Sequence, residues 1–485
     1  MADSYEPGDY VKVEFPDKTT GIGEWMWVRV SPLRRSEATC LRYARQRAIE
    51  RLRRQGRPRV RTGGQLFPES ESTGNLPSSQ VSESVLHTSP RDLCHDMSPR
   101  VIQRSAAEEI MLNRRSILIL ALLVLTPFSF ASGKEKKQPV LHPVGFSLRQ
   151  FAAPADYNWR GADDHALSGI VWYPAAASPG EEKDQYVGPP DAPPLFYAGR
   201  AAKDATLAPA FGRFPLIALS HGTGGSAMQM AWLGTYLAAR GYIVVAVNHP
   251  GNNAVTGYTT QGFIEGWERA KDISTAITNL LGDPRFGPKI DPGRIGAAGF
   301  SYGGYTMMEL AGARTDLQRL LAWCDEQKDA CNPPEMPDQM QKFRAIRQQP
   351  DVQQALQGSG DSYRDPRIRA VFAIAPAVAR AFTPQSLQKI TIPVEIVVGA
   401  ADPIAPPGEN AQFFATNING ARLTILPGGV GHYTFLDVGT EAGKKQLPQL
   451  FADDAGVDRQ AVHDQVGQMA AEFFDKELAP EKKKG

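Results

Sequence analysis

The pattern of apolar residues changes along the chain, and between about residues 139 and 478 short apolar runs alternate with longer amphipathic stretches. Most of the short runs are apolar throughout, as strands covered on both faces must be. These predicted strands are residues 169–173, 215–220, 243–248, 295–299, 370–375, 394–399 and 421–426. The amphipathic stretches predict helices over residues 227–240, 262–281, 303–313 and 457–478. This alternation predicts an α/β fold with a doubly wound, mostly parallel sheet.

One segment, residues 315–365, interrupts the alternation. It contains Pro333-Pro334, many Gln and Asp residues and only weak helical patterns. We therefore expect a cap-like insertion over one edge of the sheet. Cys324 and Cys331 lie in this segment and are the only cysteines after residue 131. Export would place them in an oxidising compartment, so we expect them to form a disulfide.

Residues 111–131 have the layout of a secretory signal peptide. A pair of arginines precedes an unbroken apolar run over residues 117–125, and Ser129-Phe130-Ala131 supplies the small residues of a cleavage site. A membrane span needs about 20 apolar residues, and this run is shorter. We therefore expect a periplasmic or secreted protein whose exported form begins at Ser132.

The 110 residues before Met111 allow two interpretations. Either Met111 is the initiator and residues 1–110 are not part of the working protein, or they are a cytoplasmic extension held by an anchor. Residues 62–105 are rich in Ser and Pro, which is typical of disorder, while residues 9–30 alternate like one or two strands. Between residues 29 and 61 there are twelve arginines and two acids, a pattern of a solvated basic helix or of nucleic-acid contact. The composition favours the first interpretation.

Composition narrows the class of protein. Apolar residues make up 42% and charged residues 22% of the 485 positions, which is ordinary for a soluble protein with a core. The formal charge is +1, and from Met111 onward 36 Lys and Arg face 37 Asp and Glu, so no global field recruits nucleic acid. Four cysteines and eight histidines argue against a disulfide scaffold and a multi-metal protein. Phosphate-loop, dinucleotide and zinc-protease motifs are absent from the sequence, and we expect no cofactor.

Residues 299–303 read Gly-Phe-Ser-Tyr-Gly and carry the candidate nucleophile, Ser301. The pattern alone is weak, but this copy lies directly between a predicted strand and a predicted helix. That is the setting of a nucleophile elbow, in which a strained turn lifts the serine hydroxyl clear of the sheet. Side chains at positions 299 and 303 would crowd the neighbouring strand and helix, which accounts for both glycines. The alternative is an ordinary glycine-rich turn with a capping serine.

A serine hydroxyl needs a base and an acid to act as a nucleophile, and candidates for both follow Ser301 in the chain. His432 lies in a glycine-rich loop between the last predicted strand and the final helix. Asp402 stands just past the carboxyl end of a predicted strand, where open α/β sheets bind ligands. The alternative for Asp402 is an Asx turn ahead of Pro403. His463, on the final helix, is expected at the surface or in packing.

The oxygen of a tetrahedral intermediate needs two N–H donors. Tyr302, which follows the candidate nucleophile, should supply one. The other should come from the loop after residues 215–220, where Gly222 permits a tight turn and leaves the N–H of Thr223 as the donor. His221 in this loop is expected to fix its conformation by hydrogen bonds rather than to act as a second base.

The motifs together resemble an α/β-hydrolase family. They are His-Gly-Thr-Gly-Gly at 221–225, Ala-Trp-Leu at 231–233, Gly-Tyr-Ile-Val-Val-Ala at 241–246, Asn-His-Pro-Gly-Asn at 248–252, Gly-Phe-Ser-Tyr-Gly-Gly at 299–304 and Gly-His-Tyr-Thr-Phe at 431–435. The group is that of the predicted dienelactone hydrolases, related to platelet-activating-factor acetylhydrolases and more distantly to cutinase-like polyesterases. The resemblance covers residues 139–478.

This resemblance implies the α/β-hydrolase fold, a triad of Ser301, Asp402 and His432, and oxyanion donors at Thr223 and Tyr302. True dienelactone hydrolases use a cysteine nucleophile, whereas position 301 is serine. A serine carboxylesterase is therefore the safer description.

We expect hydrolysis of short to medium uncharged acyl esters through an acyl-enzyme, with a small-molecule ester as substrate and no nucleic-acid or stable membrane partner. A serine peptidase of the same fold, or a polyester or lactone hydrolase, is the alternative. Met228 and Trp232 follow the glycine-rich loop closely, so some of the side chains there should line an apolar acyl slot. Packing in the helix core is the alternative for at least one of them.

Overall fold

The structure is a computed structural model. It describes residues 10–16, 23–29, 141–176, 182–189, 191–209, 212–327, 331–333 and 336–480. The chain divides into two compact units, Met1–Glu135 and Lys136–Gly485. The predicted signal segment 111–131 and the Ser/Pro-rich stretch 62–105 lie outside the described residues.

In the first unit, two short strands pair with each other. They are β1 (Tyr10–Pro16) and β2 (Gly23–Arg29), which run antiparallel with Tyr10 opposite Arg29. The strand pattern expected over residues 9–30 is thereby confirmed.

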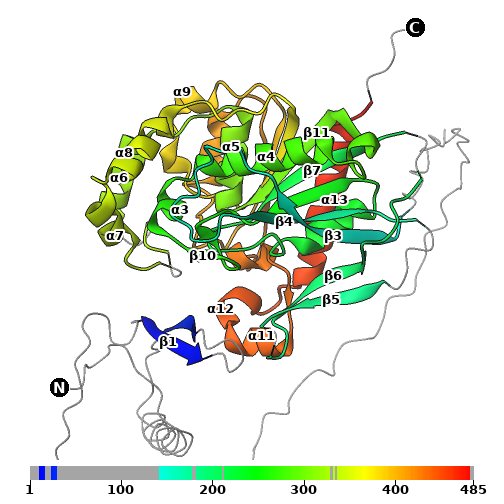
Figure 1. The fold of residues 1–485 in the computed structure, drawn as a ribbon, viewed down its shortest axis with the longest axis horizontal. Coiled ribbons are helices and arrows are strands. Elements are labelled where there is room, and N and C mark those ends of the chain that lie inside the picture. Colours follow the sequence, from blue (N-terminus) through cyan, green and yellow to red (C-terminus); the bar gives the residue numbers. More distant parts are fainter. Residues whose placement is uncertain are drawn as a thin grey trace, which may run out of the picture. The chain divides into compact units, whose positions relative to one another are not determined.

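A sheet of eleven strands organises the described part of the second unit (Figure 1). Its order is β14-β13-β12-β11-β7-β8-β4-β3-β6-β15, with β5 paired to β6. These strands are β3 (Val144–Phe151), β4 (Leu167–Pro174), β5 (Lys183–Val187), β6 (Phe196–Lys203), β7 (Phe214–Ser220), β8 (Ile243–Val247), β11 (Ile290–Phe300), β12 (Ile368–Ile374), β13 (Val394–Gly399), β14 (Arg422–Leu426) and β15 (Val438–Gly439). The six strands from β14 to β8 are parallel, which confirms the mostly parallel sheet that the sequence predicts. A separate two-stranded pair is formed by β9 (Asn252–Asn253) and β10 (Gly257–Tyr258).

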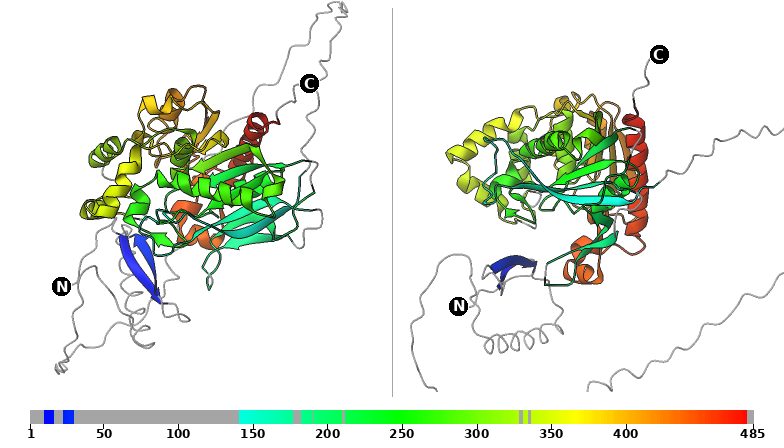
Figure 2. Two further views of the ribbon diagram at one scale, coloured as in Figure 1. Left: turned by 45° about the horizontal axis from the view of Figure 1, so that its top comes forward. Right: turned by 45° about the vertical axis from the view of Figure 1, so that its right-hand side comes forward.

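Helices cover both faces of this sheet. The helices described in this unit are α2 (Ala231–Ala238), α3 (Thr260–Ile264), α4 (Glu268–Gly282), α5 (Tyr302–Ala311), α6 (Leu317–Glu326), α7 (Gln339–Ile346), α8 (Pro350–Gln357), α9 (Pro384–Leu387), α10 (Ala411–Asn417), α11 (Glu441–Gln446), α12 (Pro448–Phe451) and α13 (Arg459–Glu477). The helices α4 and α5 pack together on one face, and α2 and α13 pack together on the other (Figure 2). The predicted doubly wound arrangement is confirmed.

The composition of the central strands places them in the core. Every residue of β7 and of β8 is buried, and each fully buried Val, Leu or Ile contributes about 1.5–3 kcal/mol of transfer free energy. Small residues in β11 let helices approach closely, since a Cβ added at Gly296 would lie 2.7 Å from the ring of Phe474 on α13. The carboxyl ends of these parallel strands meet at one edge of the sheet. Ser220 is the last residue of β7, Ser301 follows β11 directly, and Asp402 lies shortly after β13.

The structure corrects three sequence predictions. The strand β4 runs antiparallel to both of its neighbours, and β3, β5, β6 and β15 were not predicted at all. The strand β5 has no buried residue, and β3 and β6 each contain exposed residues, so these strands lack a continuous apolar signal. The predicted helix over 262–281 is two helices, α3 and α4. Between them Gly266 lies against α5, where an added Cβ would come within 2.0 Å of the hydroxyl of Tyr302.

Residues 315–365 contain the helices α6, α7 and α8, which Figure 1 draws next to α3. The side chain of Asp316 caps α6 by accepting a hydrogen bond from the backbone N–H of Arg319 at 3.0 Å. A disulfide joins Cys324 on α6 to Cys331, as the sequence predicts, with the two Cα atoms 5.4 Å apart. The helix α7 contacts α3, and α6 contacts the turn at residues 379–381.

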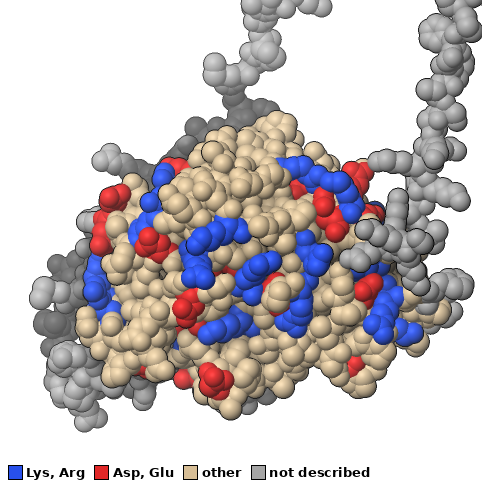
Figure 3. Space-filling view, turned by 90° about the horizontal axis from the view of Figure 1, so that it is seen from above, with Lys and Arg blue, Asp and Glu red and all other residues tan. Residues whose placement is uncertain are grey.

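Charged side chains of both signs share the surface. On the face drawn in Figure 3, Lys and Arg side chains form a broad band, and Asp and Glu side chains lie among them. This mixture agrees with the near-equal numbers of basic and acidic residues after Met111. Among the described residues, none of the helices has the length and apolar character needed to cross a membrane.

Candidate active site

The candidate nucleophile lies at a sharp turn between β11 and α5. Ser301 has φ 55° and ψ −115°, a conformation that residues other than glycine rarely adopt. Its backbone N–H donates to the carbonyl of Ile374 at 2.9 Å, which ties the turn to β12. A Cβ at Gly299 would lie 2.3 Å from the carbonyl oxygen of Gly303, and one at Gly303 would lie 2.1 Å from that of Ser220. The steric reason that the sequence suggests for both glycines is confirmed.

Three side chains that are far apart in the sequence meet at this turn. His432 Nε2 lies 2.9 Å from Ser301 Oγ, and His432 Nδ1 lies 2.7 Å from Asp402 Oδ2. A carboxylate only accepts, so Nδ1 carries the proton and Nε2 is free to accept from the serine hydroxyl. The three residues are 6%, 3% and 4% exposed for Ser301, His432 and Asp402. The structure thus brings together the three residues that the sequence predicts as a group.

Asp402 also forms the Asx turn that the sequence offered as an alternative. Its Oδ1 accepts from the backbone N–H groups of Ile404 at 2.9 Å and Ala405 at 2.8 Å, while Oδ2 bonds His432. The Asx-turn interpretation is therefore confirmed, and it is compatible with the contact to His432, whereas the role of Asp402 in catalysis stays a prediction. The turn fixes the carboxylate so that its second oxygen faces the imidazole.

The two predicted oxyanion donors have free N–H groups. Tyr302 is the first residue of α5, so its N–H has no partner within the helix. In the described part of the chain, neither the N–H of Tyr302 nor the N–H of Thr223 donates a hydrogen bond. Thr223 lines the same cavity as Ser301 and His432. A carbonyl oxygen of a substrate attacked by Ser301 could therefore accept from both groups.

That cavity has a volume of about 760 Å³. Its walls are mostly apolar. They come from the strand β6, the helix α12 and the residue before it, the insertion, and the loops after β12 and β13. The residues include Leu195, Phe196, Trp323, Pro333, Val378, Ile404, Leu447, Leu450 and Phe451. Residues of the insertion thus form part of the wall beside Ser301.

Met228 and Trp232 do not line this cavity, so the predicted acyl slot is wrong for both. Trp232 stacks on His463 with ring centroids 4.2 Å apart, and its Nε1 donates to the carbonyl of Phe435. Met228 packs against the hydrophobic core. Trp232 faces inward because α2 packs against α13, so core packing, the stated alternative, holds for it. His463 is a packing residue, one of the two positions expected for it.

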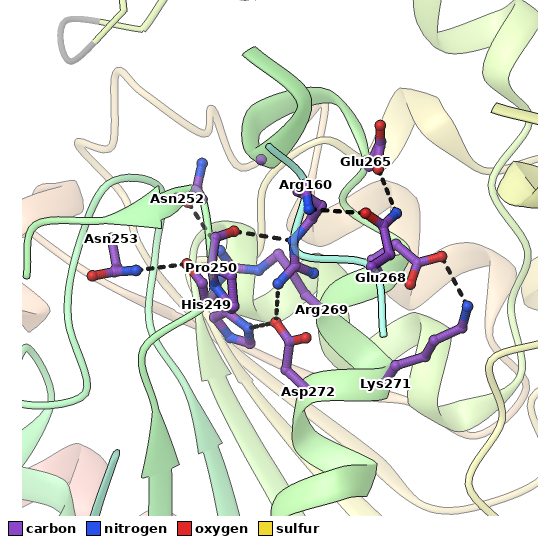
Figure 4. Close-up of polar contacts among 12 residues, drawn as sticks. Arg160, His249, Pro250, Asn252, Asn253, Glu265, Glu268, Arg269, Lys271 and Asp272 are labelled. Carbon is purple, nitrogen blue, oxygen red and sulfur yellow. Dashed lines mark hydrogen bonds and ion pairs between the residues drawn. The ribbon is translucent and has the colours of Figure 1, made fainter. Parts of the chain in front are cut away.

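A second Ser–His–Asp group lies beneath the loop that carries Thr223. His249 Nε2 is 2.9 Å from Ser220 Oγ. On the other side of the ring, His249 Nδ1 is 2.7 Å from Asp272 Oδ2, the contact that Figure 4 draws. All three are almost completely buried, and none lines the cavity. Burial, together with the charge of Arg269, lowers the pKa of His249 to about 3, so its imidazole is neutral.

This second group was not predicted from the sequence. Its one signal is the Asn-His-Pro-Gly-Asn motif at 248–252, which directly follows β8. Burial raises the pKa of Asp272, but Arg160 and His249 outweigh it, and the result is a lowering to about 2. Arg160 bonds Asp272 at 2.8 Å, so the carboxylate is ionised and paired.

His221 has the structural role that the sequence predicts. Its Nδ1 lies 2.6 Å from the carbonyl oxygen of Gly222, and its Nε2 accepts from the backbone N–H of His249 at 3.2 Å. Both ring nitrogens are therefore engaged. Burial holds the pKa of His221 well below its usual range, and the ring fixes the loop as a neutral group.

The Alpha/beta hydrolase family matches residues 216–442, which include Ser301, Asp402 and His432. This match agrees with the parallel sheet and its strand–turn–helix serine. The second unit has the α/β-hydrolase fold. The match supports the superfamily that the motifs resemble, whereas the dienelactone hydrolase subtype remains a prediction.

The proteins that are similar to this chain include a lipase, cutinases and a ferulic acid esterase. Lipase 1 of Moraxella sp. (strain TA144) is 29% identical over 93 residues, which are 19% of this chain and 26% of that protein. Cutinase est1 of Thermobifida alba is 30% identical over 104 residues, which are 21% of this chain and 32% of the cutinase. The chain thus covers about a third or less of the length of these relatives. A solved structure of a ferulic acid esterase from Streptomyces cinnamoneus aligns with a TM-score of 0.46 and 22% identity, over 69% of this chain and 90% of that one.

Within the part of the chain that the structure describes, no group of three or more His, Cys, Asp or Glu residues is placed to hold a metal ion. The polar groups at the cavity are instead the hydroxyl, the imidazole and the free N–H groups described above. Together these groups can bind and attack a carbonyl carbon.

The helix that begins at the elbow also contains a buried acid, Glu309. Its Oε1 accepts from Tyr305 at 3.1 Å and from Thr315, the first residue of the insertion, at 2.5 Å. Its Oε2 has no partner among the described residues. Burial raises the pKa of Glu309 to about 8, although the hydrogen bonds from Thr315 and Tyr305 lower it.

The stability of the Glu309→Gln variant relative to the unsubstituted protein should increase as the pH rises. The unfolded chain loses the Glu309 proton near pH 4.5, whereas the folded protein keeps it up to about pH 8, so the free energy of unfolding falls across that interval. Glutamine removes this dependence. We expect the free energy of unfolding of the variant, relative to that of the unsubstituted protein, to increase by about 2–4 kcal/mol between about pH 5 and about pH 8.5. Urea unfolding at the two pH values measures this change.

Glu441→Gln, at an exposed carboxylate on α11, is the control and should show no such shift. A difference for Glu309→Gln that stays constant with pH would contradict a neutral Glu309 in the folded protein.

Proposed function

We propose that the protein is a serine carboxylesterase that works through an acyl-enzyme. The observation that carries this proposal is the hydrogen-bonded chain from Ser301 through His432 to Asp402, which opens on an apolar cavity. The local similarity to Lipase 1 and to cutinase est1 supports the same class of reaction.

In the first step, Ser301 Oγ attacks the carbonyl carbon of the ester. Its proton passes to His432 Nε2, and the carbonyl π electrons move to the oxygen, which becomes an oxyanion. The N–H groups of Thr223 and Tyr302 donate to this oxyanion, which carries more charge than the carbonyl oxygen of the substrate. Asp402 stabilises the imidazolium that forms. The site therefore binds the transition state more tightly than the ester.

The tetrahedral intermediate then collapses. The C–O bond to the leaving group breaks, the leaving oxygen takes the proton from His432 Nε2, and an acyl ester on Ser301 remains. Water attacks this ester in the same manner, with its proton passing to His432. The carboxylic acid leaves and Ser301 recovers its proton from the imidazolium.

The substrate class follows from the walls of the cavity. Apolar side chains such as Phe196, Leu450 and Phe451 favour an uncharged acyl or alcohol group. We propose short to medium acyl esters as substrates and, within the superfamily, a position near the predicted dienelactone hydrolases with serine in place of cysteine. A polyester or lactone is the second candidate, favoured by the local similarity to cutinase est1.

We also propose that the protein acts after export, in the periplasm or outside the cell. The signal-peptide pattern of residues 111–131 supports this location. The Cys324–Cys331 disulfide supports it as well, because such bonds persist in oxidising compartments.

Replacing the nucleophile tests the reaction. Ser301→Ala should lower kcat for a p-nitrophenyl ester by at least about a thousandfold, since loss of a triad member costs several orders of magnitude. The variant should unfold at nearly the same temperature as the unsubstituted protein, because the strain lies in the backbone and alanine fits the turn. Retention of more than about a tenth of kcat would rule out Ser301 as the nucleophile.

A series of p-nitrophenyl esters of increasing acyl length tests the substrate class. Hydrophobic slots discriminate by only about 1–3 kcal/mol per methylene, so kcat/KM should fall gradually once the chain outgrows the cavity. A sharp optimum on long-chain lipids with interfacial activation would show the proposed substrate class to be wrong. Faster cleavage of peptides than of esters would favour the peptidase alternative.

A further inference from the structure

Arg269 on α4 is completely buried behind the loop that carries Thr223. Figure 4 draws it beside Asn252 and His249. Its Nη2 donates to the carbonyl oxygen of His221, and its Nη1 donates to Asn252 Oδ1 at 3.0 Å. Its contacts therefore reach the loop immediately before Thr223.

The same arginine also reaches the loop immediately after Thr223. Asn252 Oδ1, which accepts from Arg269, accepts from the backbone N–H of Gly224 at 3.1 Å as well. The guanidinium of Arg269 thus bonds residue 221 directly and residue 224 through Asn252. Thr223 lies between them, and its own N–H stays free.

A third branch of contacts leads to the other oxyanion donor. Arg269 Nε donates to Thr306 Oγ1 at 3.1 Å, and Thr306 Oγ1 donates to the carbonyl oxygen of Tyr302 at 3.1 Å. The guanidinium also lies over the ring of Tyr302, 4.9 Å from its centroid. One side chain therefore contacts both segments that carry the free N–H groups.

Arg269 has an unusual charge environment for a buried residue. Among the residues that the structure describes, no carboxylate forms an ion pair with it, because Asp272 pairs with Arg160 and His249. Burial lowers the pKa of Arg269 to about 9, so it remains protonated at neutral pH. Burying a cation without a paired anion is costly, and here its charge lies behind the place where negative charge develops in the reaction.

We propose that Arg269 is the positioning residue of the oxyanion hole, which holds the Thr223 loop and the first turn of α5 at the spacing that lets both N–H groups reach one oxygen. The buried Ser220–His249–Asp272 group supports this role, since Ser220 Oγ lies 3.4 Å from Arg269 Nη2. This inference rests on the proposed esterase function. It goes beyond the triad because Arg269 touches neither the substrate nor Ser301.

Arg269→Met tests the proposal, because methionine keeps an apolar stem of similar length and removes every donor. We expect kcat for a short-chain ester to fall by about 100-fold, as for loss of an oxyanion donor, with KM changed by less than about threefold. A trifluoromethyl ketone supplies the second measurement. Ser301 Oγ adds to its carbonyl carbon, the serine proton passes to His432, and the resulting oxyanion occupies the hole. Its Ki should rise by the same factor by which kcat/KM falls.

Arg285→Met is the matched control. Arg285 also donates to a hydroxyl, that of Tyr173 at 2.7 Å, and lies 4.9 Å from the centroid of the same ring, but it is not near the elbow. It should lower the unfolding temperature and leave both kcat and the Ki of the ketone unchanged. A purely structural role for Arg269 would give the same result as this control and would overturn the proposal.

Thr306→Val provides an independent test if Arg269→Met fails to fold. Valine has nearly the same shape as threonine but lacks the hydroxyl that links Arg269 Nε to the carbonyl oxygen of Tyr302. We therefore expect kcat to fall and the Ki of the ketone to rise together, each by about tenfold. Unchanged values would contradict the proposal. If the unsubstituted protein neither hydrolyses esters nor binds the ketone, the proposed function fails, whereas an active protein whose variants keep their Ki refutes only the role of Arg269.

Discussion

The site depends on one steric constraint, the close approach of three backbone segments at the turn that holds Ser301. The turn has a positive φ at Ser301, and its glycines lie so close to Gly303 and Ser220 that no Cβ fits at positions 299 or 303. This packing presses the first turn of α5 against the end of β7. It thereby brings the N–H of Tyr302 near the loop that carries Thr223. The strain is stable because β11 lies in the middle of the sheet, between the parallel strands β7 and β12, which are buried except at Arg369.

The protein contains two Ser–His–Asp groups whose hydrogen-bond distances are the same, one at Ser301 and one at Ser220. Their surroundings give them different roles. The group at Ser301 borders the cavity, and its serine faces free N–H donors. The group at Ser220 is enclosed, and its histidine is kept neutral by burial and by Arg269. The hydrogen-bond pattern alone therefore does not identify an active site. Access to a cavity and a place for developing charge decide which serine can react.

Much of the fold could be predicted from the sequence because its signals are local. The central strands are apolar throughout, and the elbow combines glycines with a strand–helix boundary, so both were recognisable without a structure. The strands β3, β5 and β6, at one side of the sheet, contain exposed residues and gave no such signal. Trp232 was misplaced because its neighbours in the chain do not show which way a short helix faces. Arg269 was not found, since a charged residue on an amphipathic helix is normally a solvated one.

Of the two serines that bond a histidine, we expect only Ser301 to be a nucleophile. This can be tested by labelling the protein with a fluorophosphonate and locating the adduct by peptide mass spectrometry. We expect one adduct per chain, on the peptide that contains Ser301. An adduct on Ser220, or an unlabelled Ser301 in a protein that hydrolyses esters, would contradict it.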